Sequence, residues 1–137
     1  MTREIKFRIW DKDNNKMLNY NNDIVPCLTL NGVLQDCSKE VSSNISYKYD
    51  LMQFTGLHDK NGKEIWEGDI IKVGSKNWFD KGYTSNEEVS IGIDGVRFGK
   101  IKPFSKMYQG EVSGQEENHY DTFEVIGNVY ENKNLLN

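Results

Sequence analysis

The sequence has little proline and cysteine, and it has no long apolar run. Its 137 residues include two prolines and two cysteines. Scarce proline, together with 28% charged residues of both signs, argues against a collagen-like or wholly disordered chain. No stretch approaches the roughly 20 apolar residues of a membrane-spanning helix, and the first residues lack the apolar core of a signal peptide. We therefore expect a soluble, cytoplasmic protein without a membrane partner.

The two cysteines, Cys27 and Cys37, have nine residues between them. They are too few and too widely spaced for a zinc knuckle. Disulfides are rare in a reducing cytosol. We therefore expect two free, packed thiols rather than a structural disulfide.

Length and charge limit the remaining classes. A chain of 137 residues fits one domain of roughly 100–150 residues. Only 36% of its residues are hydrophobic, but the 12% aromatic content supplies large side chains for a core. The net charge is −4, so the overall field opposes nucleic acid. The charge is uneven, because residues 1–17 carry five basic and three acidic groups whereas residues 111–137 carry one and six.

Apolar and polar residues alternate with a period of two, which is typical of half-buried strands. In residues 3–10, Ile5, Phe7 and Ile9 share one face. Turn sequences such as Asn61-Gly62 separate such segments. The strands predicted in this way cover residues 3–10, 17–20, 45–54, 70–73, 88–93, 95–101 and 123–130. No amphipathic helix of three turns is present, so we predict a mainly β, single domain of short antiparallel strands in a partly open, barrel-like sheet.

The prediction divides the chain into an N-terminal hairpin (3–20), a variable region (21–50) and a β core (51–132). Pro26 limits residues 24–30 to an edge strand or an irregular segment, and Asn31-Gly32 turns the chain back onto it. The most β-branched run, residues 70–73, should lie centrally in its sheet. Residues 35–46 are expected to form a short helix or a loop, residues 74–86 an excursion between strands, and Gly127 a bulge or a close backbone approach.

Three blocks of the sequence are distinctive. They are Arg3–Asp11 with Lys16-Met17, then Leu51–Leu57, Asp59–Gly62 and Ile65–Ile70, and finally Phe123–Asn132. These blocks resemble the signatures of the YopX-like family of phage and prophage proteins. The resemblance implies a mainly β architecture with a barrel-like element and an association with phages. It implies no established activity, so it supplies no catalytic residues.

His58 and Asp59 are a candidate acid–base pair. With Glu64, Glu67 and Asp69 close in sequence, they could form a general base flanked by carboxylates. A solvated turn is the favoured interpretation, because no nucleophile accompanies them at a recognisable spacing. This predicts a protein that is not an enzyme.

His119 offers a weaker candidate for a metal site. It lies among Glu116, Glu117 and Asp121, which could supply oxygen ligands. One histidine with scattered acids is more typical of a solvated acidic loop. The segment Gly92–Gly95 belongs to a turn and leads into no helix, so it is not a phosphate loop. We therefore expect neither a metal nor a cofactor.

One stretch interleaves basic and aromatic residues, the combination with which small barrels bind single-stranded nucleic acid. Its members are Arg97, Phe98, Lys100, Lys102, Phe104, Lys106 and Tyr108. Simple strand alternation produces the same pattern, with aromatics inward and cations outward. The three tryptophans, Trp10, Trp66 and Trp78, are expected in the core or at an interface.

The sequence thus favours a non-enzymatic phage or prophage accessory protein that acts as a protein-binding or self-associating β module. Many short strands leave open sheet edges, which association can cover. We predict a homo-oligomer, with a host or phage protein as a further partner. The alternative is a single-stranded nucleic-acid-binding barrel that uses residues 97–108.

Overall fold

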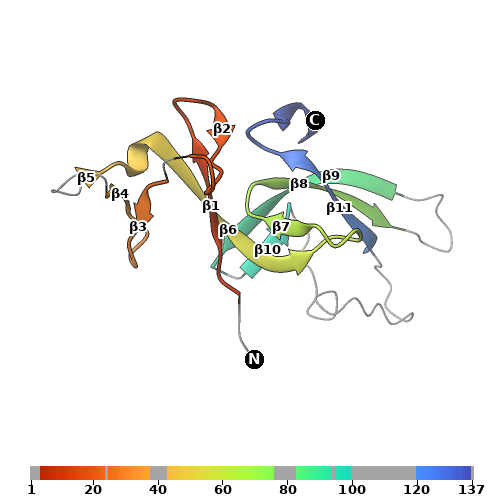
Figure 1. Ribbon diagram of the computed structural model, residues 1–137. Helices are drawn as coiled ribbons and strands as arrows, with labels where there is room; N and C mark the ends of the chain where they lie inside the picture. Colours follow the sequence, from red (N-terminus) through yellow and green to blue (C-terminus); the bar gives the residue numbers. More distant parts are fainter. Residues whose placement is uncertain are drawn as a thin grey trace. The chain divides into compact units, whose positions relative to one another are not determined.

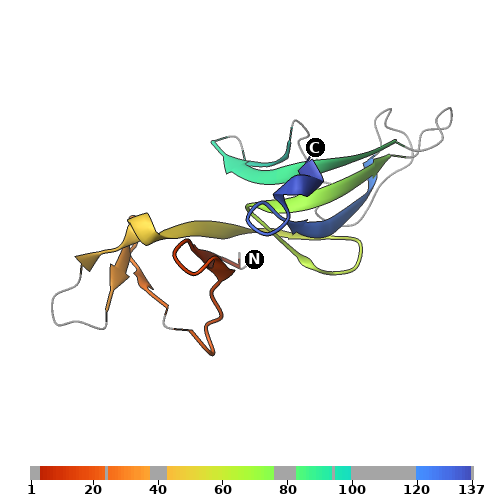
Figure 2. The ribbon, with the colours of Figure 1, turned by 90° about the horizontal axis from the view of Figure 1, so that it is seen from above.

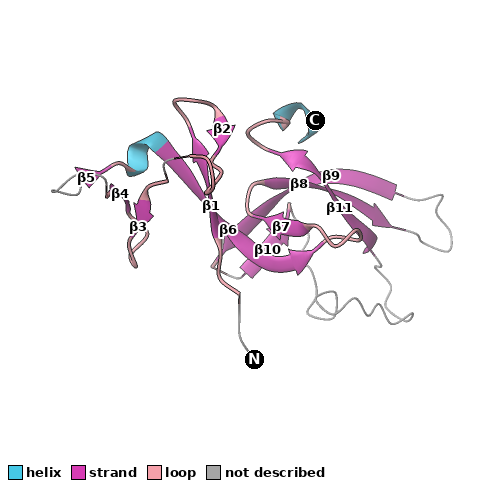
Figure 3. Ribbon diagram, viewed as in Figure 1, coloured by secondary structure: helices cyan, strands magenta, loops and turns pink. Residues whose placement is uncertain are grey.

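The fold is described from a computed structural model of the chain. The structure describes residues 4–23, 25–37, 43–75, 83–93, 95–99 and 120–136. As the sequence predicts, the fold is mainly β (Figure 3), and its sheets are open rather than closed into a complete barrel. In the described parts of the chain, the helices are the short 3-10 turns η1 (Ser46–Lys48) and η3 (Lys133–Leu136). No helix there is long and apolar enough to cross a membrane.

The chain forms two compact units. The N-terminal unit comprises Lys6–Met52, and the C-terminal unit comprises Met1–Ile5 with Gln53–Asn137. Strand β6 (Tyr49–His58) begins in the first unit and ends in the second (Figure 1).

The N-terminal unit contains a hairpin and a small sheet. Strands β1 (Phe7–Asp11) and β2 (Lys16–Met17) form the predicted antiparallel hairpin. The sheet has the order β3 (Cys27–Leu28), β4 (Leu34–Asp36), β5 (Ser43–Asn44) and is antiparallel throughout. The core of the unit consists of buried Ile9, Leu18 and Leu34, against which Val25, Tyr49 and Leu51 pack.

The C-terminal unit is built on a second hairpin and a four-stranded antiparallel sheet. Strand β6 pairs with β7 (Glu64–Trp66) around the predicted Asn61-Gly62 turn. The sheet has the order β10 (Gly95–Phe98), β9 (Tyr83–Gly92), β8 (Asp69–Ser75), β11 (Tyr120–Asn128). Figure 2 shows β9, β8 and β11 side by side in blue-green, green and blue. The buried core of the C-terminal unit consists of Leu57, Ile65, Ile71, Val73, Val89 and Phe98.

Two predictions about the C-terminal sheet are confirmed. Residues 70–73 lie in β8, between β9 and β11, and Ile70 and Ile71 are completely buried. The register of β11 against β8 shifts between Val125 and Gly127, which is the predicted bulge. A Cβ on Gly127 would lie 2.5 Å from the side-chain oxygen of Asn132, so the close approach is also present.

Other predictions are wrong in their boundaries. Residues 35–46 contain the end of β4 and all of β5, where the sequence predicts a helix or a loop. Their polar side chains carry no strand signal, because a strand with exposed faces is defined by its partners rather than by its propensity. Strand β9 begins at Tyr83, inside the predicted excursion. Ile5 precedes β1 and is exposed, although the alternation places it on a buried face.

Candidate functional site

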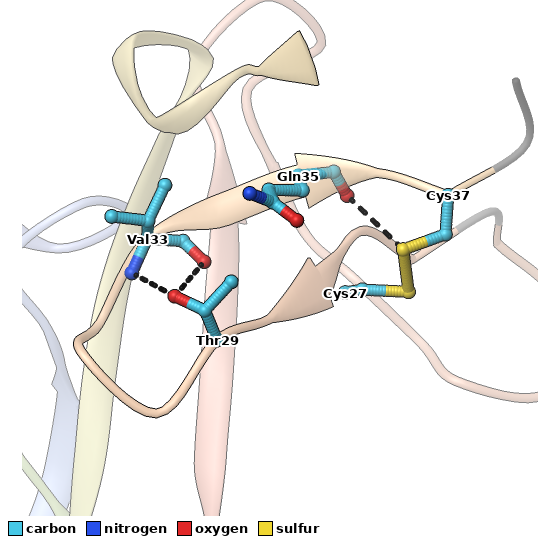
Figure 4. Close-up of a disulfide and its surroundings, with 5 residues drawn as sticks. All are labelled: Cys27, Thr29, Val33, Gln35 and Cys37. Atoms are coloured by element: carbon cyan, nitrogen blue, oxygen red, sulfur yellow. Dashed lines mark hydrogen bonds between the residues drawn. A yellow bond between two sulfur atoms is a disulfide. The ribbon is translucent and has the colours of Figure 1, made fainter. Parts of the chain in front are cut away.

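The most distinctive local feature of the N-terminal unit is a disulfide between Cys27 and Cys37 (Figure 4). This corrects the prediction of two free thiols. Antiparallel pairing of β3 with β4 places Cys27 opposite Gln35, and Cys37 follows Gln35 by two residues in the same polypeptide. The Cα atoms of the two cysteines are 6.1 Å apart, which is within the range that a disulfide spans. We refer to residues 27–37 as the disulfide hairpin.

The turn of the disulfide hairpin is held by Thr29. Its hydroxyl accepts the Val33 N–H at 3.0 Å and donates to the Val33 carbonyl oxygen at 3.1 Å (Figure 4). The backbone N–H of Thr29 donates to the same carbonyl oxygen at 2.9 Å. Gly32 adopts φ +84°, a conformation that L side chains rarely reach, and donates its N–H to the Thr29 carbonyl. The hairpin is therefore closed at one end by hydrogen bonds and at the other by a covalent bond.

The disulfide hairpin presents apolar side chains to solvent. Leu28 is 37% exposed in the edge strand β3, and Leu30 at the turn is fully exposed. A single exposed leucine is common on protein surfaces, so neither residue is unusual by itself. Two exposed leucines close together are less common. Two of them on a short edge strand and its turn mark this edge as a candidate contact surface.

A pocket lies beside the open end of the disulfide hairpin. Its volume is about 440 Å³, which is within the range of small-molecule sites. It is lined by Val25, Pro26, Asp36, Cys37, Ile45, Lys48 and Tyr49. Burial, followed by the negative charge of Asp11, raises the pKa of the Tyr49 phenol, so this hydroxyl remains protonated at neutral pH. The lining carries one ammonium and one carboxylate, so its charge favours neither an anionic nor a cationic ligand.

The predicted acid–base group does not face one reaction centre. His58 is exposed, and its ring lies edge-on to Phe54 at 5.8 Å between centroids. Asp59 is buried and accepts backbone N–H bonds at both carboxylate oxygens, from Asn61 and Lys63 at 2.9 Å and from Val125 at 3.0 Å. Its carboxylate therefore organises the polypeptide backbone.

Glu64 lies opposite His58 in the pairing of β6 with β7. Two further carboxylates of this group accept backbone N–H bonds, as Asp59 does. Glu67 accepts the backbone N–H of Gln53 at 3.2 Å, and buried Asp69 accepts that of Trp66 at 2.8 Å. In the described ranges, no three His, Cys, Asp or Glu side chains are grouped as metal ligands would be. Of the second candidate group, His119, Glu116 and Glu117 lie outside the described residues, and Asp121 lies in β11.

The candidate nucleic-acid residues are only partly described. Arg97 and Phe98 lie in β10. Phe98 is 1% exposed and packs edge-on against Phe123 at 4.9 Å between ring centroids, so its ring belongs to the core and is unavailable for stacking on a base. The remaining five, Lys100, Lys102, Phe104, Lys106 and Tyr108, lie outside the described residues.

Comparison with known families assigns the chain. The model of the YopX protein family matches residues 6–137, which is nearly the whole sequence. The chain belongs to the YopX family. This confirms the resemblance seen in the sequence segments.

A solved structure supports the fold of this YopX-family chain. The crystal structure of protein EF1440 from Enterococcus faecalis matches with a TM-score of 0.60 and 24% sequence identity. The match covers 99% of this chain and 100% of that one, and at this identity it shows a common fold alone. No curated protein matches the sequence.

Sequence reasoning missed the disulfide hairpin, although a signal for it was present. The predicted Asn31-Gly32 turn lies between Cys27 and Cys37, with three residues before it and four after it. Antiparallel strands that leave a turn bring residues at nearly equal distances from it close together. The spacing thus permitted a cross-strand bond, and only the assumed reducing compartment argued against it.

Proposed function

We propose that this YopX-family chain is a non-enzymatic accessory protein of phage or prophage, acting in the host cytoplasm, and that it works by protein binding through the outer edge of β3. The first partner we propose is a second copy of the chain. The observation that carries this proposal is the geometry of Leu28 in the disulfide hairpin.

The backbone of Leu28 points away from β4. Opposed residues of an antiparallel pair alternate between hydrogen-bonded and non-hydrogen-bonded positions. Thr29 and Val33 are a hydrogen-bonded pair, since the Thr29 N–H donates to the Val33 carbonyl. The adjacent pair, Leu28 and Leu34, is therefore the non-hydrogen-bonded kind. It follows that the N–H and the C=O of Leu28 are directed to the outer edge of the sheet.

An outward backbone and exposed leucines are what strand addition requires. The sheet order places β3 at an end, so its outer side can receive another strand. In strand addition, main-chain hydrogen bonds provide affinity and neighbouring side chains provide specificity. Two copies that join by the same edge form a closed twofold dimer, in which each Leu28 and Leu30 covers its equivalent.

Light scattering across the micromolar range tests this proposal. We expect a dimer for the wild type. Leu28→Lys places a charge on the edge, and with Leu30→Ser it should yield a monomer. Ile93→Ser is the matched control, because Ile93 is fully exposed in the C-terminal unit, and it should leave the dimer intact. A wild type that is monomeric at every concentration would refute the proposal. A dimer that persists after both leucine substitutions would show that the β3 edge is not the interface.

The nucleic-acid alternative rests on the basic and aromatic stretch that begins at Arg97. A single-stranded oligonucleotide should then shift in a salt-sensitive manner, because phosphate contacts release counterions. The shift should be lost when Lys100→Ala and Lys102→Ala are combined. Absence of any shift at low salt would retire this alternative.

A further inference from the structure

The Cys27–Cys37 disulfide lies where a soluble thiol can reach it. Both cysteines are exposed, and neither belongs to the buried cluster of the N-terminal unit. Exposed disulfides exchange readily with other thiols, whereas buried structural ones resist reduction. In the cytoplasm, where we place the protein, a disulfide is usually transient and responds to redox conditions.

The bond also lies where the pairing of β3 with β4 ends. The register of β3 against β4 continues from Leu28 opposite Leu34 to Cys27 opposite Gln35, and the next pair would be Pro26 with Asp36. The pairing of β3 with β4 covers two residue pairs, and the disulfide holds the end at which it stops.

The two ends of the disulfide hairpin should therefore respond differently to reduction. At the turn, Thr29 and Val33 keep their hydrogen bonds without the disulfide. At the open end, the disulfide adds to the pairing of Cys27 with Gln35, and a ladder of two residue pairs is marginal without it. Reduction thus frees the strand whose outer edge we propose as the binding surface.

We propose that the Cys27–Cys37 bond is a reversible thiol–disulfide switch that orders β3 when oxidised and releases it when reduced. The part of this inference that concerns binding rests on the proposed function. The oxidised form presents a fixed edge for self-association, and the reduced form does not. Cys37 and Pro26 also line the neighbouring pocket, so the same change alters its wall.

The chemistry is exchange with a dithiol. One dithiol thiolate attacks a sulfur of the Cys27–Cys37 bond, which forms a mixed disulfide and releases the other cysteine as a thiolate that takes up a proton. The second dithiol sulfur, as a thiolate, then attacks the mixed disulfide and leaves as a cyclic disulfide, releasing the second cysteine. Two electrons and two protons pass to the protein in total. The sulfur of Cys37 lies 3.9 Å from the Gln35 carbonyl oxygen, which is available to accept a bond from the new thiol.

The experiment compares the native full-length protein before and after treatment with dithiothreitol and again after re-oxidation. Alkylation and mass spectrometry count the free thiols, and amide hydrogen exchange reports local order. We expect two thiols to appear without denaturant, and exchange at Gln35, which pairs with Cys27, to accelerate about tenfold or more. Exchange at Ile71 in β8 should change less than about twofold, which shows that the C-terminal unit stays folded. Re-oxidation should restore the slow exchange.

A variant and a second measurement separate the possible failures. Cys27→Ser combined with Cys37→Ser should show the reduced pattern in either buffer. Thiols that appear only in denaturant, or unchanged exchange at Gln35 after two thiols have been counted, would overturn the switch. If reduction accelerates amide exchange at Gln35 but leaves the dimer fraction unchanged, the disulfide does not control self-association. A wild type that is monomeric in both states removes the proposed function, whereas thiol counts and exchange still decide the switch.

Discussion

The Asp59 carboxylate accepts the backbone N–H of Val125 at 3.0 Å, although 66 positions separate the two residues. Next to this bond, the Lys60 N–H donates to the Phe123 carbonyl oxygen at 2.9 Å. Strand β11 is the last strand of its sheet order, so the turn between β6 and β7 covers its outer edge. A covered edge cannot pair with another chain, which is one way in which proteins limit aggregation.

This contact gives a structural role to two of the segments that resemble the YopX-like family. The turn Asp59–Gly62 is hydrogen-bonded to β11, which contains the first residues of the segment Phe123–Asn132. The aspartate satisfies backbone donors of its own turn and of β11 at once. These segments therefore have a role in joining the β6–β7 hairpin to the sheet, which requires no reaction chemistry.

Replacement of Asp59 should destabilise the protein. Asp59→Ala leaves three backbone N–H groups without their acceptor, and each buried unsatisfied group costs about 1–3 kcal/mol, part of which water recovers. We expect the free energy of unfolding, measured by urea titration, to fall by about 2–4 kcal/mol. Lys60→Ala is the control, since it removes a half-exposed ion pair with Glu124 that contributes about 0–1 kcal/mol. Equal effects of the two substitutions would contradict this role of the carboxylate.

The same carboxylate should make stability depend on pH in the acid range. Burial raises the pKa of Asp59, but hydrogen bonds from Val125, Lys63 and Asn61 lower it more, so the folded-state pKa lies below its ordinary value. Its stabilisation is complete above the unfolded pKa of about 4 and is lost as the pH falls through the folded pKa.

Urea titrations of the wild type and of Asp59→Asn at several pH values measure this dependence. The difference in unfolding free energy should be constant from about pH 5 to pH 7 and should shrink below about pH 4. A difference that grows on acidification would have the opposite sign and would exclude the assignment.

Gly127→Ala should be costly because of Asn132. The added Cβ would lie within 2.5–2.8 Å of three side-chain atoms of Asn132, whose oxygen accepts the Asn128 N–H at 3.2 Å. We expect a loss of about 1–3 kcal/mol in thermal or urea unfolding, as for other overpacked sites. In an Asn132→Gly background, which removes all three of these atoms, the same substitution should cost much less, and a double-mutant cycle measures this coupling. Additive effects of the two substitutions would show that the crowding is not responsible.

Phe98→Ala should test whether this aromatic ring serves the core. Removal of a buried phenylalanine typically costs about 3–5 kcal/mol, and Phe98 is 1% exposed. Ile93→Ala, at a fully exposed position, should cost less than about 0.5 kcal/mol in the same urea titration. A loss of oligonucleotide affinity by Phe98→Ala without a loss of stability would instead assign the ring to binding.

Local sequence signals predicted much of the fold. Asn61-Gly62 marks the β6–β7 turn, and Asp94-Gly95 lies where β9 turns into β10. Pro26 indicates the edge character of β3, because proline cannot serve in a central strand. These turn and strand preferences depend on a few neighbouring residues, so they are the same whatever place the strand takes in the sheet.

The candidate sites were less predictable. His58 and Asp59 are adjacent in sequence, but one is exposed while the carboxylate of the other binds backbone N–H groups. Phe98 has the spacing of a stacking residue, and the sheet buries it against Phe123. A spacing cannot distinguish these outcomes, because burial depends on which distant strand covers the face.

The sequence by itself determined the extended character of the chain, its turns and its family, since alternation, Asn-Gly and Asp-Gly dipeptides and signature segments are properties of neighbouring residues. Only the tertiary structure decided that Cys27 and Cys37 form a bond, that polar residues 43–44 form a strand, and that Asp59 joins a turn to Val125. The Asp59–Val125 bond closes a loop of 66 positions, which no local pattern specifies. The other two depend on which neighbouring segments pair and in which register, and the composition of residues 27–44 does not fix that.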